Sequence, residues 1–210
     1  MQAFDEHGGG HILRGHESEW NPEKEGSRSP HLSEQQSSQL IDLVLERYER
    51  ETGTRPTRVV VQKTSRYWLA ERAGFVEALK PRTARYDLLA LDGRQSHVRL
   101  ITASKYPPLR GTRFCVGDLD VLYTTGFITS LNEFHGMHVP SPVRIADHIG
   151  QDTSRRQLLA ELLTLAKLNW NSAGFAGKLP VTLRFAELVG DILKEIPADR
   201  EPLPQFKFYI

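Results

Sequence analysis

The sequence predicts an α/β fold in which a mixed β-sheet is flanked by helices. Helical segments with one apolar face alternate with short β-branched runs between residues 33 and 125. A helix that leads into a buried strand implies a crossover connection and parallel pairing. We divide the chain into a polar, loop-rich segment over 1–32 and an α/β region over 33–210. We expect the sheet to be incomplete on its N-terminal side, because only 1–32 could supply a strand before this region.

The polar N-terminal segment is rich in glycine, proline and charged residues, which favour turns. One short strand is expected there, over 12–14. The first helix is expected over 33–51, since apolar residues recur on one face. Ser33 and Gln36 have the spacing of a capping box, and Gly53 is expected to end the helix.

The middle of the chain predicts strands on either side of a second helix over 69–79. The run Arg58–Gln62 is continuously apolar and β-branched at its centre, which is typical of a strand buried on both faces. We expect it to pair in parallel with an earlier strand. Asp92-Gly93 indicates a hairpin. The strands expected after the second helix are Tyr86–Leu91, His97–Thr102, Arg110–Val116 and Asp120–Thr125.

The last third of the chain predicts two amphipathic helices. One is expected over about 153–169, and the other from Pro180, a residue favoured in the first helical turn. Between the strands and these helices, Val139–Pro142 contains two prolines and is expected to be an extended connection. The tail 206–210 is apolar to its last residue, so we expect it to be docked.

Composition excludes several classes of protein. A hydrophobic fraction of 39% and a charged fraction of 25% are typical of a globular domain. No apolar run approaches the roughly 20 residues that span a bilayer, so no membrane partner is expected. Cys115 is the single cysteine, which excludes an intrachain disulfide. A cytoplasmic location fits this composition best.

Charge is distributed unevenly along the chain. Residues 1–53 hold 5 basic and 11 acidic residues, residues 54–113 hold 13 and 4, and residues 114–210 hold 9 and 11. The middle block therefore carries +9, although the whole chain carries only +1. A polyanion would favour this block, because displaced counterions contribute to binding. A well-solvated surface is the alternative.

Six short motifs then follow one another in a characteristic order: Arg58–Ser65, Lys105–Pro107, Tyr123–Gly126, Leu165–Asn171, Leu179–Thr182 and Phe208–Ile210. Together they resemble the C-terminal half of the PIWI domain of prokaryotic Argonautes. The resemblance covers about 150 to 180 residues. It implies an RNase H-like fold, without the N-terminal, PAZ and MID parts of the family and without the PIWI strand that bears the first catalytic aspartate.

The resemblance also implies that the cleavage site is degenerate. Active relatives hold two metal ions with a set of carboxylates, or carboxylates and a histidine. The third catalytic position falls on Thr64, which follows Lys63, and the fourth falls on the helix after Pro180, at or next to Glu187. The loop glutamate would be Glu34. We therefore expect no catalytic residues. Without the resemblance, Thr64-Ser65 indicates a turn, and Glu187 a solvated helix face.

Nucleic-acid-binding candidates lie in two groups. The first belongs to the middle block and could follow a phosphate backbone: Lys63, Arg66, Lys105, Arg110 and Arg113. The second lies at a helix end and the following loop: Lys167, Asn169 and Asn171. Ordinary surface charge is the alternative for the first group, and C-capping for the second. Trp68 and Trp170 could stack on bases, although core packing is commoner for tryptophan.

One metal site follows from the resemblance alone. In Argonautes the C-terminal carboxylate helps to hold a divalent ion on the 5′ phosphate of the guide strand. In this chain that carboxylate belongs to Ile210. Mg²⁺ is therefore expected at the guide 5′ phosphate.

The functional interpretation is a nucleic-acid-binding module, part of a guide-dependent Argonaute with an inactive cleavage site. Its expected partners are guide and target nucleic acid, together with a second chain that supplies the MID part and the first half of the PIWI domain. One alternative is a guided, metal-dependent endonuclease completed by such a chain. The other is a truncated Argonaute remnant with no activity alone.

Overall fold

The computed structural model describes most of the chain, and that part falls into two compact units. Each unit is described by itself. The described residues are 1–5, 8–13, 31–93, 98–101, 103, 107–117, 119–134, 139–150, 152–168, 177–197, 200, 203 and 205. The first unit comprises Met1–Val60, Tyr67–Tyr86 and Ala186–Ile210, and the second comprises Val61–Arg66 and Asp87–Phe185.

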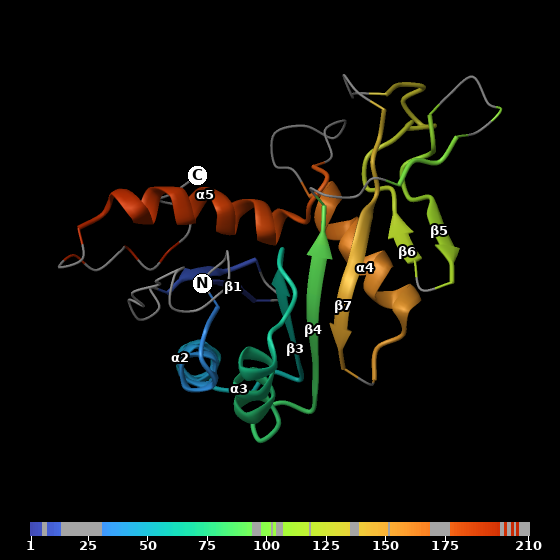
Figure 1. Ribbon diagram of the computed structural model, residues 1–210. Helices are drawn as coiled ribbons and strands as arrows, with labels where there is room; N and C mark the ends of the chain where they lie inside the picture. The colour runs from blue at the N-terminus through green and yellow to red at the C-terminus, as the bar shows by residue number, and fades with distance from the viewer. Residues whose placement is uncertain are drawn as a thin grey trace, which may run out of the picture. The chain divides into compact units, whose positions relative to one another are not determined.

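A five-stranded sheet with the order β3-β4-β7-β6-β5 organises the fold. Strand β4 pairs antiparallel with β7, β7 with β6, and β6 with β5. In Figure 1 the arrows of β3 and β4 run in the same direction. The sheet is therefore mixed, which confirms the predicted α/β class. The strands are β3 Arg58–Lys63, β4 Arg85–Asp92, β5 Arg113–Val116, β6 Leu119–Leu122 and β7 Val143–Ile149.

The core of the second unit lies between its strands and helix α4, Arg155–Lys167. Residues Leu88–Leu91 of β4 are almost completely buried on both faces of the sheet. Helix α4 lies alongside β7 (Figure 1). It begins after Ser154, whose Oγ accepts a hydrogen bond from the Gln157 amide at 3.2 Å. The predicted helix is confirmed, with an end two residues earlier than expected.

The first unit contains two packed helices and a small hairpin. Helix α2, Glu34–Thr52, packs against α3, Leu69–Leu79. The hairpin joins β1, Gln2–Phe4, to β2, Gly10–Ile12. Helix α5, Val181–Glu195, is shared by both units. Among the described residues, no helix is long and apolar enough to cross a lipid bilayer.

Both predicted ends of α2 are confirmed. The Gln36 amide donates to Ser33 Oγ at 3.2 Å, and the Ser33 amide donates to Gln36 Oε1 at 2.9 Å. This reciprocal capping box satisfies two backbone N–H groups that have no partner within the helix. Gly53 ends the helix with φ 70°, where a residue without Cβ is favoured.

Replacing Ser33 with Ala is expected to lower the free energy of unfolding by about 1 kcal/mol, because the cap hydrogen bond is lost. The midpoint of urea unfolding measures this change. Ser38→Ala, inside the same helix, is a matched control that should be neutral or slightly stabilising, since alanine is the better helix former. Equal losses in the two variants would contradict the assignment of the cap.

The N-terminal segment differs from the prediction. We expected one strand over 12–14, whereas β1 and β2 form a two-stranded antiparallel hairpin that ends at Ile12. The turn between them is held locally, because the Gly9 amide donates to Asp5 Oδ1 at 2.7 Å. Three-residue strands are too short to produce a recognisable alternation, which is why the sequence did not reveal the pair.

The prediction of a hairpin at Asp92-Gly93 is wrong. None of the residues 98–101 lies in a strand, and β4 instead pairs with β7, which lies about fifty residues later in the sequence. The Leu100 amide donates to Tyr123 Oη at 2.7 Å, so a side chain rather than a strand ladder holds this segment. Strand β7 was not predicted: the extended connection expected over Val139–Pro142 ends just before it, and no strand was assigned to the residues that follow.

Strand β3 is also placed differently. It stands at one end of the strand order, and its neighbour in the described part of the sheet is β4, not an earlier strand. Val61 is its only buried residue, at 6% exposure, although burial on both faces was expected. A run of valines therefore indicated the strand correctly, but its edge position could not be read from the run.

Candidate functional site

The end of β3 and the start of α5 lie side by side in the second unit. Thr182 Oγ1, in the first turn of α5, donates a hydrogen bond to Gln62 Oε1 at 2.6 Å. Gln62 is the penultimate residue of β3. Two motifs that are 120 residues apart in the sequence, Arg58–Ser65 and Leu179–Thr182, are therefore brought together by one side-chain contact.

The residues assigned to the degenerate cleavage site come from three elements and from both units. Lys63 is half-buried at the strand end, and Thr64 is exposed immediately after it. Glu187 lies five residues beyond Thr182 on α5 and is half-buried. It therefore does not lie on a fully solvated helix face, which was the interpretation without the resemblance. Glu34 is exposed in the first turn of α2. Within the described ranges, no three His, Cys, Asp or Glu side chains gather where they could hold a metal ion.

Arg113 forms an ion pair with Asp120. Its Nε and Nη2 lie 2.9 and 2.8 Å from the two carboxylate oxygens of Asp120, across the β5–β6 hairpin. The hydrogen bonds to Asp120 raise the pKa of Arg113. Arg155 Nε lies 3.9 Å from the same carboxylate. The Asp120 carboxylate offsets the charge of Arg113, which is therefore less available to a phosphate than its position in the middle block suggested.

Two other candidates are better placed. Arg66 is exposed just beyond β3, and Arg110 is half-exposed in the turn before β5. Within the described residues, neither side chain makes a hydrogen bond or ion pair. Lys167 is exposed in the last turn of α4, where a cation is favoured by the helix dipole. Lys105, Asn169, Asn171 and Ile210 lie outside the described residues.

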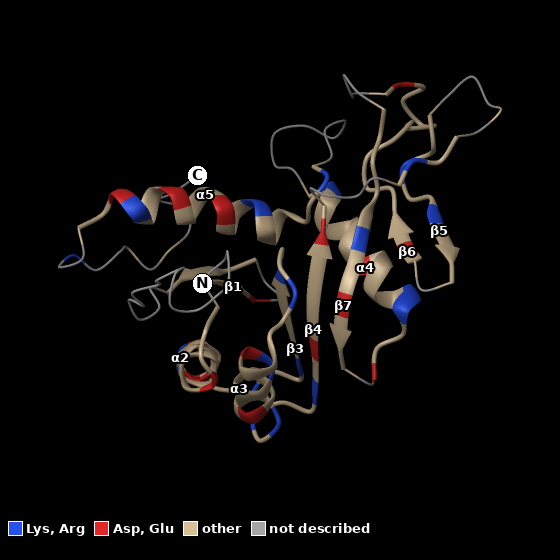
Figure 2. Cartoon of the chain, in the orientation of Figure 1, with Lys and Arg blue, Asp and Glu red and all other residues tan. Residues whose placement is uncertain are grey.

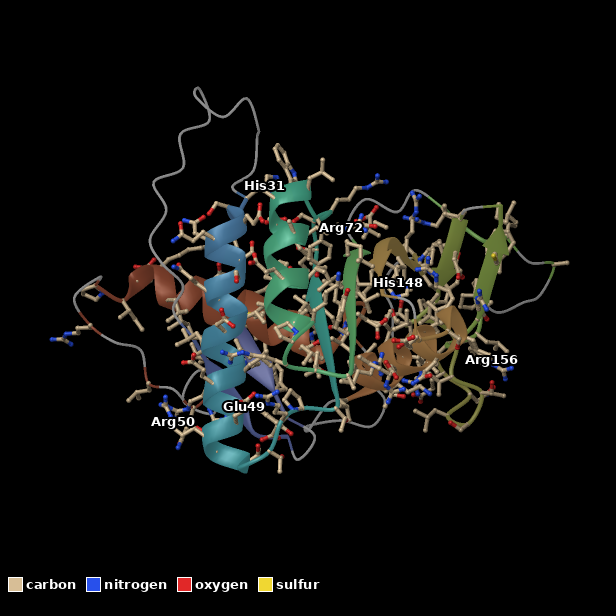
Figure 3. All side chains as sticks on the ribbon, turned by 90° about the horizontal axis from the view of Figure 1, so that it is seen from below. His31, Glu49, Arg50, Arg72, His148 and Arg156 are labelled. Atoms are coloured by element: carbon tan, nitrogen blue, oxygen red, sulfur yellow. The ribbon has the colours of Figure 1, made fainter. Side chains whose placement is uncertain are left out.

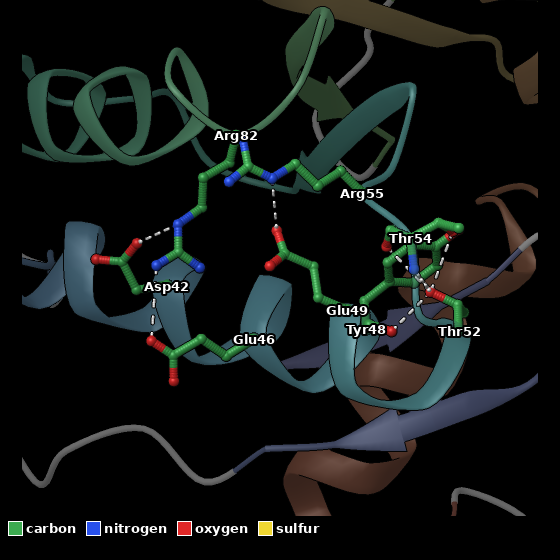
Figure 4. Close-up of polar contacts among 8 residues, drawn as sticks. All are labelled: Asp42, Glu46, Tyr48, Glu49, Thr52, Thr54, Arg55 and Arg82. Carbon is green, nitrogen blue, oxygen red and sulfur yellow. Dashed lines mark hydrogen bonds and ion pairs between the residues drawn. The ribbon is translucent and has the colours of Figure 1, made fainter.

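Part of the positive charge of the middle block is paired within the first unit. Arg82 Nε lies 3.4 Å from Asp42, and its Nη2 lies 3.6 Å from Glu46 (Figure 4). Arg55 Nε lies 3.7 Å from Glu49 (Figure 4). The acidic side chains all come from α2. The charge of +9 therefore overstates the charge that is free to attract a polyanion.

A cluster of cations that the sequence did not reveal lies at the end of β4. Arg144, on β7, is paired in register with Asp92, the last residue of β4, so that basic and acidic positions are adjacent in Figure 2. Arg144 Nε is buried and has no hydrogen-bond partner among the described residues. Burial and the nearby Arg99 lower the pKa of Lys178, and Asp92 opposes that shift. Lys178 thus lies within electrostatic range of both Arg99 and Asp92, and Arg144 is the register partner of that aspartate.

The second unit also contains a buried polar cluster around Asp87. Asp87, on β4, is completely buried. His148 Nε2, on β7, lies 2.9 Å from its Oδ1, and Thr153 Oγ1 donates to its Oδ2 at 2.7 Å. The sequence signal was an aspartate inside the apolar run of β4, and a charged residue in such a run is rarely buried without partners. The cluster joins β4, β7 and the residue before the cap of α4.

No protein-family model matches the chain, and no curated protein matches it. Solved structures of Argonaute do match. The crystal structure of Aa-Ago with externally bound siRNA has a TM-score of 0.60 and 21% sequence identity, over 84% of this chain and 23% of that one. The crystal structure of A. aeolicus Argonaute has a TM-score of 0.59 and 21% identity, over 84% and 24%. A further Aquifex aeolicus Argonaute structure has a TM-score of 0.58 and 22% identity, over 83% and 23%.

These matches confirm, at the level of the fold, the resemblance that the sequence motifs indicated. The chain spans about a quarter of the length of the Argonautes that it matches. The mixed sheet and its helices therefore form an α/β fold that is shared with one segment of Argonaute.

Proposed function

We propose that this chain is a nucleic-acid-binding module, part of a guide-dependent, Argonaute-like PIWI domain whose metal-dependent cleavage site is not competent. The observation that carries the proposal is the fold that it shares with Argonaute, one structure of which was solved with siRNA. The exposed Arg66 and the cations at the end of β4 support it. Both places supply cationic side chains, the residue type that contacts phosphate oxygens.

The cations at the end of β4 suit a phosphate group for a further reason. A guanidinium nitrogen that is buried without a partner costs free energy, and an anionic oxygen would satisfy it. Arg144 Nε is such a nitrogen among the described residues. The lowered pKa of Lys178, due to burial and Arg99, also means that a bound anion would stabilise its charged form.

Binding is expected to depend on Arg66 and Arg110. Replacing both with Ala should weaken the binding of a labelled single-stranded oligonucleotide. It should also flatten the salt dependence by about 1.4 in the slope of log K against log salt, because each lost phosphate contact removes roughly 0.7. Fluorescence anisotropy from low to moderate salt measures both quantities.

The matched control removes the same charge from paired positions. Arg55 and Arg82 both face carboxylates of α2, so replacing both with Ala changes the net charge equally but removes no expected phosphate contact. This variant should keep the wild-type salt slope. Equal slopes in all three proteins would contradict the binding surface, and an absence of binding by the wild-type chain would contradict the proposed function.

The loss of cleavage is argued from donor chemistry. Mg²⁺ requires hard, preferably anionic oxygen ligands. The position after β3 offers the neutral hydroxyl of Thr64 beside the ammonium of Lys63, which does not fit a pair of divalent ions. The relevant assay combines the chain with guide, labelled target and Mg²⁺ or Mn²⁺. A guide-dependent product that is abolished by chelation would support the endonuclease alternative instead.

The partners in this proposal are a guide strand and a target strand, with a second chain that supplies the MID part and the first half of the PIWI domain. Mg²⁺ at the guide 5′ phosphate, held with the carboxylate of Ile210, belongs to the same proposal. Comparing the affinity for 5′-phosphorylated and 5′-hydroxyl guides, with and without Mg²⁺, tests it directly. Equal affinities under all four conditions would remove the metal and the Ile210 carboxylate from the proposal.

A further inference from the structure

We propose that the indole of Trp68 is a stacking site for a base of single-stranded nucleic acid. This inference rests on the proposed function and adds to it a site that contacts a base instead of a phosphate. Trp68 lies immediately before α3 and is 48% exposed, which is unusual for so large an apolar side chain. A tryptophan that only filled the core would bury most of that surface.

The indole already belongs to a stack. The ring of His31 lies against it, with a centroid separation of 4.0 Å and an interplanar angle of 28°. The imidazole side chain is only 11% exposed, so it backs the indole from within the first unit. Trp68 thus keeps about half of its surface exposed although His31 is stacked on it, and we infer that the opposite face of the indole receives a third ring. A base added there would extend an existing column.

A buried carboxylate holds the two aromatic residues in place. Glu71 is 2% exposed. Its Oε2 accepts a hydrogen bond from the Trp68 amide at 3.1 Å, and its Oε1 accepts one from the Leu32 amide at 3.1 Å. Glu71 therefore ties the backbone of Trp68 to the residue next to His31. A stacking surface held in this way loses little conformational entropy when it binds.

The surroundings favour a base of a nucleic acid over another apolar partner. Arg72 lies four residues after Trp68, one helical turn further along the same face of α3, and it is exposed. Figure 3 shows His31 and Arg72 at the same end of the helix pair α2 and α3. A cation beside an aromatic ring is the combination by which sequence-tolerant proteins bind single strands, since every base has a π-face.

The experiment compares two oligonucleotides of equal length, one with bases and one abasic, in anisotropy titrations of the full chain. Trp68→Ala should weaken binding of the base-containing strand roughly tenfold, the effect of losing one stacked base. Binding of the abasic strand should be unchanged, and so should the salt slope. Trp68→Phe should recover part of the loss. Leu69→Ala is the matched control, because Leu69 is next to Trp68 and is 84% exposed. This variant should bind both strands with the affinity of the wild type.

The outcomes separate this inference from the proposed function. If the wild-type chain binds both strands and Trp68→Ala binds them equally well, the stacking site is overturned and the proposed function stands. If Trp68→Ala weakens both strands alike, Trp68 acts through the fold and the stacking site is again overturned. If the wild-type chain binds neither strand, the proposed function fails and the inference fails with it.

Discussion

Replacing Asp87 with Ala is expected to lower the free energy of unfolding by about 3 kcal/mol, the effect of removing one member of a buried, hydrogen-bonded polar cluster. The Asp87 carboxylate is completely buried and lies within hydrogen-bonding distance of both His148 and Thr153. Its loss would leave two buried polar groups without their partner and would open a small cavity. The midpoint of urea unfolding should fall while the slope stays the same.

The control for this variant is an aspartate that also makes a side-chain polar contact but is largely exposed to water. Asp191 lies 2.7 Å from Lys194 on α5, with both side chains 74% exposed. Exposed ion pairs contribute little to stability, because water solvates the separated charges almost as well. Asp191→Ala should therefore leave the unfolding midpoint nearly unchanged. A loss as large as that of Asp87→Ala would mean that burial does not determine the effect.

A second variant tests whether the geometry of the cluster matters. Thr153→Ser keeps the hydroxyl that donates to Asp87, whereas Thr153→Val keeps the shape and removes the donor. The valine variant should be the less stable of the two, by about 1 to 2 kcal/mol, since one carboxylate oxygen loses a hydrogen bond. A valine variant as stable as the serine variant would show that the hydroxyl contributes nothing.

The cluster illustrates which parts of the fold the sequence could predict. Helices α2 and α4 were found because local features, an apolar face and a capping serine, favour them within a single segment. Helices α3 and α5 were also predicted, α5 from its apolar face and from Pro180 before it. The Asp87 cluster depends on three segments that meet only in the folded chain. The aspartate in an apolar strand was visible, but its partners His148 and Thr153 could not be chosen from the sequence.

Strand pairing was the second limit. The pattern of β4 was predicted almost to the residue, yet its antiparallel partner was assigned to the next apolar segment rather than to β7. Sequence proximity is a weak guide to pairing, because the free energy depends on which faces are buried together and not on the length of the loop. In β7 only Val143 and Ile145 are buried, so the alternation is too short to identify the strand from the sequence.

Charge was the third limit. Counting residues located the basic block correctly, but the count could not distinguish an arginine that faces water from one that faces a carboxylate. Arg82 and Arg113 are paired, whereas the Arg66 side chain makes no hydrogen bond or ion pair among the described residues. A count of charges along the sequence therefore locates a basic block, but it cannot say which of its side chains are free to contact a phosphate.

The second large effect on stability is expected at Gly74, where α3 packs closely against α2. Alanine normally stabilises a helix interior relative to glycine by about 1 kcal/mol. At Gly74 of α3, however, an added Cβ would lie 2.0 Å from the Glu34 carbonyl oxygen and 2.8 Å from the Ser37 Cβ of α2. Neither atom can rotate away, so the helices must separate. We expect Gly74→Ala to destabilise the chain by about 2 kcal/mol, because overpacking of this kind outweighs the gain in propensity.

Gly190 of α5 provides the matched control, since it is also a glycine inside a helix, but an added Cβ would meet no atom within 4 Å. Gly190→Ala should therefore be stabilising, by about 0.5 to 1 kcal/mol. Opposite signs in urea unfolding would locate the effect of Gly74 in helix packing rather than in helix propensity. The Trp68–His31 stack joins the starts of the same two helices. Gly74→Ala should thus also weaken base-dependent binding, and a variant that was more stable than the wild type would show that α2 and α3 are not in close contact at this point.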